Sequence, residues 1–151
     1  MIRAILILTF TLCFAGSALS QKGGDYTLSV QKAPVKQGEN YLVEVTLTNN
    51  KPETLYYYSM SCSWQDFYQI DNDLFTINGS ECDKNVPVVL SLVSGKSTMV
   101  MLSLSPINSP GKLITFRIGF NLLQPTNPVA LPAWEDMLDK NVVWTDEVSL
   151  P

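Results

Sequence analysis

Histidine is missing from all 151 residues of this chain, and its absence excludes the commonest ways of activating a nucleophile. Ser-His-Asp and Cys-His catalysis both need an imidazole to take the proton of the nucleophile. Zinc sites of the usual kinds also lose their nitrogen ligand. General acid–base work would fall to carboxylates, lysine or tyrosine alone. We therefore predict no catalytic residue, no metal ligand and no cofactor, and we expect that the protein is not an enzyme.

Positive charge is also scarce, because ten Lys and Arg stand against 14 Asp and Glu and give a net charge of −4. The chain has no basic run and no glycine-rich phosphate loop after a strand. An acidic chain of this kind is a poor match for the phosphates of nucleic acid or for an anionic membrane surface. We expect neither of these partners.

Long apolar runs are missing too, since no stretch reaches the ~20 residues that span a bilayer. Residues 1–20 instead have the organisation of a cleavable signal peptide: Arg3, an uncharged apolar stretch over 4–15, and small residues before Gln21. An uncleaved anchor or a buried N-terminal helix is the alternative. Cleavage leaves residues 21–151 as one domain with a net charge of −5, since Arg3 leaves with the peptide. We expect an exported protein, secreted or periplasmic, with no membrane span after cleavage.

Cysteine is rare, with Cys13 in the predicted leader and only Cys62 and Cys82 after it. In an oxidising compartment an even cysteine count usually means a disulfide. A bridge closing a loop of this length should stabilise the fold by about 3 kcal/mol in the chain-entropy model. Two separate thiols remain the alternative. A metal site is disfavoured because no histidine can complete it.

Alternation of apolar and polar residues with a period of two dominates residues 21–151. It is clearest over 41–49, where Tyr41, Val43, Val45 and Leu47 share one face. One buried face and one solvent-exposed face are typical of an antiparallel sheet. Further strands are predicted at 25–33, 54–60, 64–70, 87–93, 98–104, 112–123 and 141–150, with a hairpin over 74–82 and a short helical turn over 134–140.

The strand pattern indicates an all-β fold, because no convincing long helix interrupts it. Seven to nine short strands with uneven loops are typical of an immunoglobulin-like antiparallel β-sandwich. A chain of this size, with no internal repeat or second composition shift, is expected to form a single domain and to be a monomer.

Aromatic residues gather in one region, at Tyr56, Tyr57, Tyr58, Trp64, Phe67 and Tyr68. Exposed rings could stack on sugars or anchor a protein partner. The other interpretation is that about half of them fill the core, since alternation already places some rings inside. Tyr57, Trp64 and Tyr68 are our candidate binding residues. They predict a binding or accessory module that recognises a protein or a glycan.

Two further patterns have an ordinary explanation beside a functional one. Asp71, Asp73, Glu81 and Asp83 could supply oxygen ligands to calcium, but their spacing fits a calcium loop poorly and a solvated acidic hairpin explains them. Asn78-Gly79-Ser80 matches the glycosylation sequon. It is equally the Asn-Gly pair of a type I′ hairpin turn, which is the reading that we prefer.

Four segments together carry a resemblance: Ser61-Cys62-Ser63-Trp64-Gln65, Cys82-Asp83-Lys84-Asn85-Val86-Pro87, Phe116-Arg117-Ile118-Gly119-Phe120 and Val143-Trp144-Thr145. With them the chain resembles a group of uncharacterised small exported bacterial proteins with an immunoglobulin-like sandwich. The resemblance covers most of residues 21–151. It implies export, the disulfide and the sandwich, and it implies no activity.

A second resemblance rests on an asparagine-rich turn after a strand, an aromatic strand, and the Leu-x-x-Gly-Lys-Ser element from Leu92 to Ser97. These features are similar to the BsuPI-type proteinase inhibitor domain, an immunoglobulin-like sandwich that blocks serine proteases. The resemblance implies an alternative function, protease inhibition through a projecting loop, for which the proline-containing stretch 124–132 is the candidate. No residue of an inhibitory loop can be carried over.

Overall fold

The structure is a computed structural model, and it describes residues 24–107, 114–127 and 141–150. The predicted signal peptide lies outside these residues. So do the helical turn predicted at 134–140 and the part of the candidate loop from 128 to 132.

Short antiparallel strands and one 3-10 turn are the regular elements of the described residues, so the predicted all-β fold is confirmed. In chain order the elements are β1 (Tyr26–Ser29), β2 (Val35–Gln37), β3 (Asn40–Asn49), β4 (Leu55–Met60), η1 (Trp64–Phe67), β5 (Tyr68–Ile70), β6 (Phe75–Ile77), β7 (Pro87–Leu92), β8 (Ser97–Pro106), β9 (Ile114–Phe116), β10 (Ile118–Asn121), β11 (Val142–Trp144) and β12 (Val148–Leu150). These twelve strands exceed the seven to nine expected, because two of the long predicted strands are each divided in two and β2 forms where no strand was predicted.

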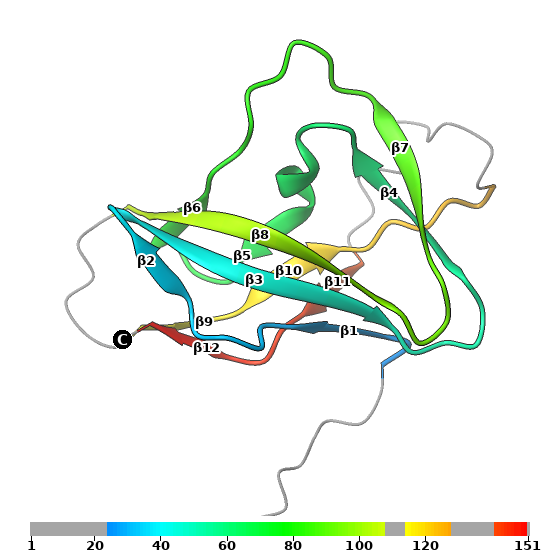
Figure 1. The fold of residues 1–151 in the computed structure, drawn as a ribbon, viewed down its shortest axis with the longest axis horizontal. Coiled ribbons are helices and arrows are strands. Elements are labelled where there is room, and N and C mark those ends of the chain that lie inside the picture. The colour runs from blue at the N-terminus through cyan, green and yellow to red at the C-terminus, as the bar shows by residue number, and fades with distance from the viewer. Residues whose placement is uncertain (1–23, 108–113, 128–140, 151) are drawn as a thin grey trace, which may run out of the picture.

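One layer of the sandwich is the sheet β1-β3-β8-β6, with β2 paired to one end of β3. Its centre is the long antiparallel pair of β3 and β8, which stays in register from Tyr41–Leu104 to Thr48–Ser97. In Figure 1 these two strands run side by side across the molecule.

The second layer is built from shorter ribbons, β4–β7, β11–β10–β5 and β12–β9. A backbone hydrogen bond from Tyr58 N to Leu123 O, 2.9 Å long, ties β4 to the chain that leaves β10. In Figure 1 β5, β10 and β11 lie behind β3 and β8, while β4 and β7 diverge from β8 on one side.

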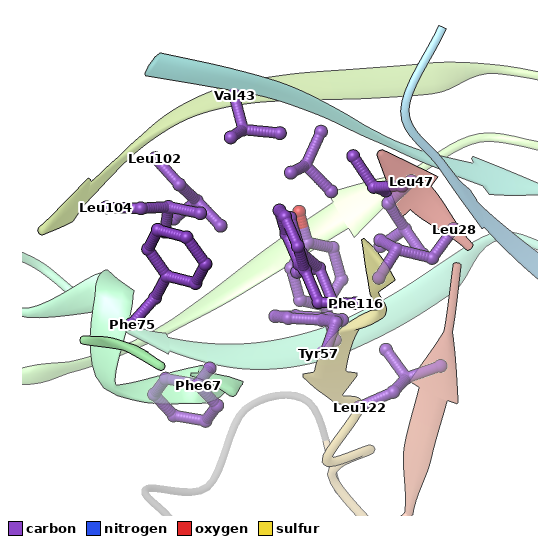
Figure 2. Close-up of a cluster of buried hydrophobic side chains, with 14 of the residues drawn as sticks. Leu28, Val43, Leu47, Tyr57, Phe67, Phe75, Leu102, Leu104, Phe116 and Leu122 are labelled. Atoms are coloured by element: carbon purple, nitrogen blue, oxygen red, sulfur yellow. The ribbon is translucent and has the colours of Figure 1, made fainter. Parts of the chain in front are cut away.

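The core lies between the two layers, where the inward residues of β3 and β8 meet aromatic side chains of the second layer. Val43, Val45 and Leu47 are almost fully buried, which confirms the alternation predicted for this strand. Figure 2 shows side chains from both layers pointing into this common space, among them Val43, Leu47, Leu102, Leu104, Tyr57, Phe116 and Leu122. Burial of this apolar surface is the main term that stabilises such a fold.

Asn49, the last residue of the strand predicted over 41–49, ties one end of the sandwich together. Its side chain is fully buried, and Nδ2 donates hydrogen bonds to Glu53 O (2.8 Å) and Leu92 O (2.9 Å). Gly95 N donates to Asn49 O (2.8 Å), and Gly95 has a φ of +67°, which a glycine adopts without steric cost. Asn49 therefore joins the end of β3 to the turn between β7 and β8.

The strands predicted at 112–123 and 141–150 are wrong as continuous units, because each is broken in the middle. β9 pairs with β12, whereas β10 pairs with β11 and β5. At the break, Ile118 N donates to Thr145 Oγ1 (3.0 Å) and Thr145 N donates to Ile118 O (2.9 Å). The side chain of Thr145 thus replaces a backbone partner, and the chain changes neighbours on either side of it.

The prediction of an extended segment over 64–70 is also corrected, since η1 occupies its first half. Asn85 Oδ1 accepts hydrogen bonds from the backbone N–H groups of Cys62 and Ser63, both 3.3 Å long. Asp66 N donates to Ser63 O (3.0 Å), which closes the turn. The bonds from Asn85 come from a residue more than twenty positions away in sequence, so local alternation could not reveal them.

The hairpin predicted over 74–82 is not formed, because β6 pairs with β8 instead. A type I′ turn needs positive φ at both central residues, and neither Asn78 nor Gly79 has it. The Asn78 side chain bonds the hydroxyls of Ser103 (2.9 Å) and Ser105 (2.9 Å). The role of Asn78 is therefore to fix β6 on β8, and the amide nitrogen that a glycan would use donates to Ser103.

Candidate binding groove

The disulfide predicted between Cys62 and Cys82 is present, with 6.3 Å between the two Cα atoms. Asn85 supports it, since Asn85 Nδ2 donates to Ser63 Oγ (2.7 Å) in addition to the bonds that its Oδ1 accepts. Ser61 N also donates to Val86 O (2.9 Å). The bridge and these bonds hold η1 against the end of the β4–β7 ribbon, and so position Trp64.

A groove of about 290 Å³ opens where β4 and β7 diverge from β8. Tyr57, Trp64 and Tyr68, the three residues singled out from the sequence, all line it. Phe120 of β10 also contributes, as do Ser59, Met60 and Ser61 at the end of β4. None of the lining residues is charged.

The walls of the groove come from two strands that the sequence did not connect with it. Val88 and Leu90 of β7 line one side, and Thr98 and Val100 of β8 line the other. Leu90 remains 41% exposed although it lies opposite Tyr57 across the β4–β7 pair. Alternation alone carries no sign of this site, because it cannot say that the two strands diverge.

The aromatic rings of the groove form a connected cluster around Phe120. The ring centroid of Phe120 lies 4.8 Å from that of Tyr68 and 5.9 Å from that of Tyr57. Trp64 meets Tyr68 edge to face, with 6.0 Å between centroids and an interplanar angle of 90°. Such pairs add to the stability of the cluster beyond the area that they bury. The rings are therefore held in place before any ligand arrives.

The two tyrosine hydroxyls in the groove are neutral donors that have no partner in the described part of the chain. Burial raises the pKa of Tyr57, and burial together with the nearby Tyr57 raises the pKa of Tyr68 further. Neither hydroxyl forms a hydrogen bond within the described residues, and neither is sealed from solvent. Each can therefore donate to, or accept from, a polar group that enters the groove.

The rest of the aromatic group is divided between core and surface. Tyr56 is 44% exposed, while Phe67 is buried. Alternation along a strand puts Tyr57 on the face opposite Tyr56 and Tyr58, yet Tyr58 is buried as well. The interpretation that about half of these rings fill the core is confirmed by Tyr57, Tyr58 and Phe67. Recognition of a partner by the rings that line the groove stays a prediction.

The acidic residues do not assemble into a metal site. Asp71 pairs with Arg117, with 2.9 Å between Oδ2 and Nε, and it accepts the backbone N–H of Arg117 at 2.8 Å. That backbone hydrogen bond, assisted by the guanidinium, lowers the pKa of Asp71. Arg117 also stacks over the ring of Trp144, 5.2 Å from its centroid. Among residues 24–107, 114–127 and 141–150, no three His, Cys, Asp or Glu side chains gather as metal ligands would.

Comparison with known proteins adds no relative: neither the protein-family models nor the curated proteins include a match to this chain. Within the described part of the chain, no helix has the length and apolar character needed to cross a membrane.

Proposed function

We propose that this chain is an exported, non-enzymatic binding module that recognises a protein or a glycan through the groove between β7 and β8. The observation that carries the proposal is the convergence of Tyr57, Trp64 and Tyr68 on one uncharged groove. Tyrosine and tryptophan dominate binding energy at many interfaces because they offer a large apolar surface and one polar group.

Export is supported by the leader-like pattern of residues 1–20 and by the disulfide. Disulfides form and persist in oxidising compartments and are rare in the cytosol. The bridge also positions Trp64 at the groove through η1. An oxidising location would therefore be needed for the binding site as well as for stability.

The test is capture of partners from the envelope and the medium of the host, using the purified protein as bait. We expect Trp64→Ala to abolish capture, because the ring lines the groove. Tyr56→Ala is the matched control, since Tyr56 is exposed on β4 and is not part of the lining. Equal capture by both variants would reject the groove as the binding site.

Protease inhibition through the loop at 124–132 is the second candidate. Gln124 Nε2 donates to Tyr26 Oη (2.9 Å), which anchors the start of this loop to β1, and an anchored loop suits an inhibitor that must stay rigid. A panel of exported serine proteases tests it. Unchanged protease rates at saturating protein would dismiss this candidate.

A further inference from the structure

The side of the sandwich that holds the groove has two strand edges without partners among residues 24–107, 114–127 and 141–150. β8 pairs with β3 along one edge throughout, but along its other edge it pairs with β6 only from Leu104 to Pro106. β7 pairs with β4 alone among the described strands. In Figure 1 the two strands leave their connecting turn in different directions, so neither covers the edge of the other.

The direction in which the unpaired backbone groups of β8 point follows from the hydrogen bonds that β8 makes with the chain at Asn78. Ser103 O accepts the N–H of Asn78, so the backbone of Ser103 faces the outer edge of β8. Alternate residues of an antiparallel strand face the same neighbour, which places the N–H and C=O groups of Met99 and Met101 on that edge. Within the described residues no hydrogen bond engages these four groups.

The side chains beside this edge are suited to apolar, uncharged groups. Thr98 and Val100 alternate with Met99 and Met101 and line the groove. Because no lining residue is charged, a charged side chain entering the groove would lose hydration without gaining a counterion.

We propose that the outer edge of β8 binds an extended, neutral segment of a partner polypeptide as an added strand. Backbone groups of the segment pair with Met99 and Met101, and alternate side chains of the segment enter the groove. This is the mode in which main-chain bonds supply affinity and pockets for alternate side chains supply specificity. The inference rests on the proposed binding function and names its partner class.

The size and shape of the groove favour a peptide over a glycan. A volume of about 290 Å³ is at the lower limit of small-molecule pockets, which run from ~300 to 1,000 Å³, and suits a few aliphatic side chains. Trp64 and Tyr68 stand at 90° to one another, so they do not form one flat platform for a sugar. The free edge from 97 to 102 corresponds to an added strand of about 20 Å at ~3.3 Å per residue.

The experiment selects binders from a phage-displayed library of random ten-residue peptides and measures them as synthetic peptides against the purified protein. N-methylation at each peptide position in turn should weaken binding at least tenfold at alternate positions only, because only alternate N–H groups of an added strand face β8. Amide exchange should slow at Met99 and Met101 when peptide binds, and stay unchanged at Thr98 and Val100.

Two variants at one position separate the backbone from the side chain. Met99→Pro removes an N–H that has no partner in the described residues, and proline is tolerated on edge strands, so we expect at least tenfold weaker binding. Met99→Ala keeps the N–H and should change the affinity less than twofold. If the proline variant does not fold, the N-methylation series on the unaltered protein still decides the question.

Each other outcome overturns the proposal. Peptides that bind without an alternating N-methyl pattern, or glycans that bind at Trp64 when no peptide does, would reject strand addition and leave the binding function standing. Slow amide exchange at Met99 and Met101 without peptide would mean that the edge is already covered by a segment of this chain. If the exchange rate depends on protein concentration, a second copy of the chain covers the edge instead. Partner capture that does not depend on Trp64 would reject the groove as the binding site, and no capture at all would reject the binding function itself.

Discussion

The two halves of β8 differ in burial although they share one partner strand and one alternation. Leu102 and Leu104 point inward and are fully buried. Thr98 and Val100 point to the same side of the sheet, yet they are only half-buried and line the groove. The difference lies in what covers each half. Phe75 of the neighbouring strand β6 and Phe116 of the second layer lie in the core with Leu102 and Leu104 (Figure 2), whereas β4 and β7 diverge from the half that holds Thr98 and Val100 (Figure 1). Alternation thus sets the direction of a side chain, and the second layer decides its burial.

The largest expected change in stability comes from a substitution in the covered half of β8, compared with one in its open half. Leu104→Ala should lower the free energy of unfolding by about 4 kcal/mol, because it removes a buried side chain and leaves a cavity. Val100→Ala, on the same face, should cost only about 1 kcal/mol, since its site is already open to solvent. Urea unfolding of both variants measures the difference. Equal losses would mean that the open half is covered in solution.

Removal of the disulfide tests whether the position of Trp64 in the groove depends on the bridge. Cys62→Ser combined with Cys82→Ser should cost about 3 kcal/mol through the loop that is released in the unfolded state. It should also increase the mobility of Trp64, which follows Cys62 by two residues and is held by η1. Urea unfolding gives the first effect and tryptophan fluorescence anisotropy the second. A loss of stability without a change in anisotropy would show that Asn85 alone positions η1.

A substitution of Asn49 tests the end of the sandwich where β3 meets the turn between β7 and β8. Asn49→Ala should cost about 2 kcal/mol, because it leaves the carbonyls of Leu92 and Glu53 without their donor in a buried place. Asn50→Ala is the matched control, since the Asn50 amide bonds Gly24 O and Thr27 Oγ1 at an exposed position. Its cost should stay below about 1 kcal/mol. Similar costs, measured as shifts of the unfolding midpoint, would deny Asn49 this role.

The smallest effect concerns the ion pair of Asp71 with Arg117, near the break between β9 and β10. The pKa of this carboxyl is lower in the folded than in the unfolded chain, so its contribution is present above pH 4, about the unfolded pKa, and is lost as pH falls through the folded pKa. Because both side chains are partly exposed, the contribution should be only about 0.5 kcal/mol.

Urea unfolding at pH 7 and at pH 3 measures this contribution. Asp71→Asn should lose part of the pH dependence of the free energy of unfolding. Asp73 has no ion pair in the described residues, so Asp73→Asn should keep that pH dependence. Identical pH profiles for the two variants would show that the pair stabilises nothing.

Much of the fold could be predicted because its signals are local. The alternation from Tyr41 to Leu47 predicted both the strand and its buried face, and the cysteine count predicted the bridge. The segment at 64–67 could not be read in this way, because Asn85 holds it in a turn from a distant point in the sequence. The break at Arg117 likewise depends on Thr145, which lies between β11 and β12.

The candidate site was predicted only in part. Tyr57, Trp64 and Tyr68 were found because aromatic residues are dense in one segment. Leu90 and Val100 were not found, because nothing in their own strands distinguishes a wall of a groove from a core position.

By itself, the sequence determined the all-β class, the inward and outward sides of the main strands, and the absence of histidine-based chemistry. These properties depend on residue types and on a period of two, which act within a few residues. Only the tertiary structure decided which inward residues are covered and which edges stay unpaired. That decision depends on where β4, β7 and β8 separate, and contacts between segments far apart in the chain set this geometry.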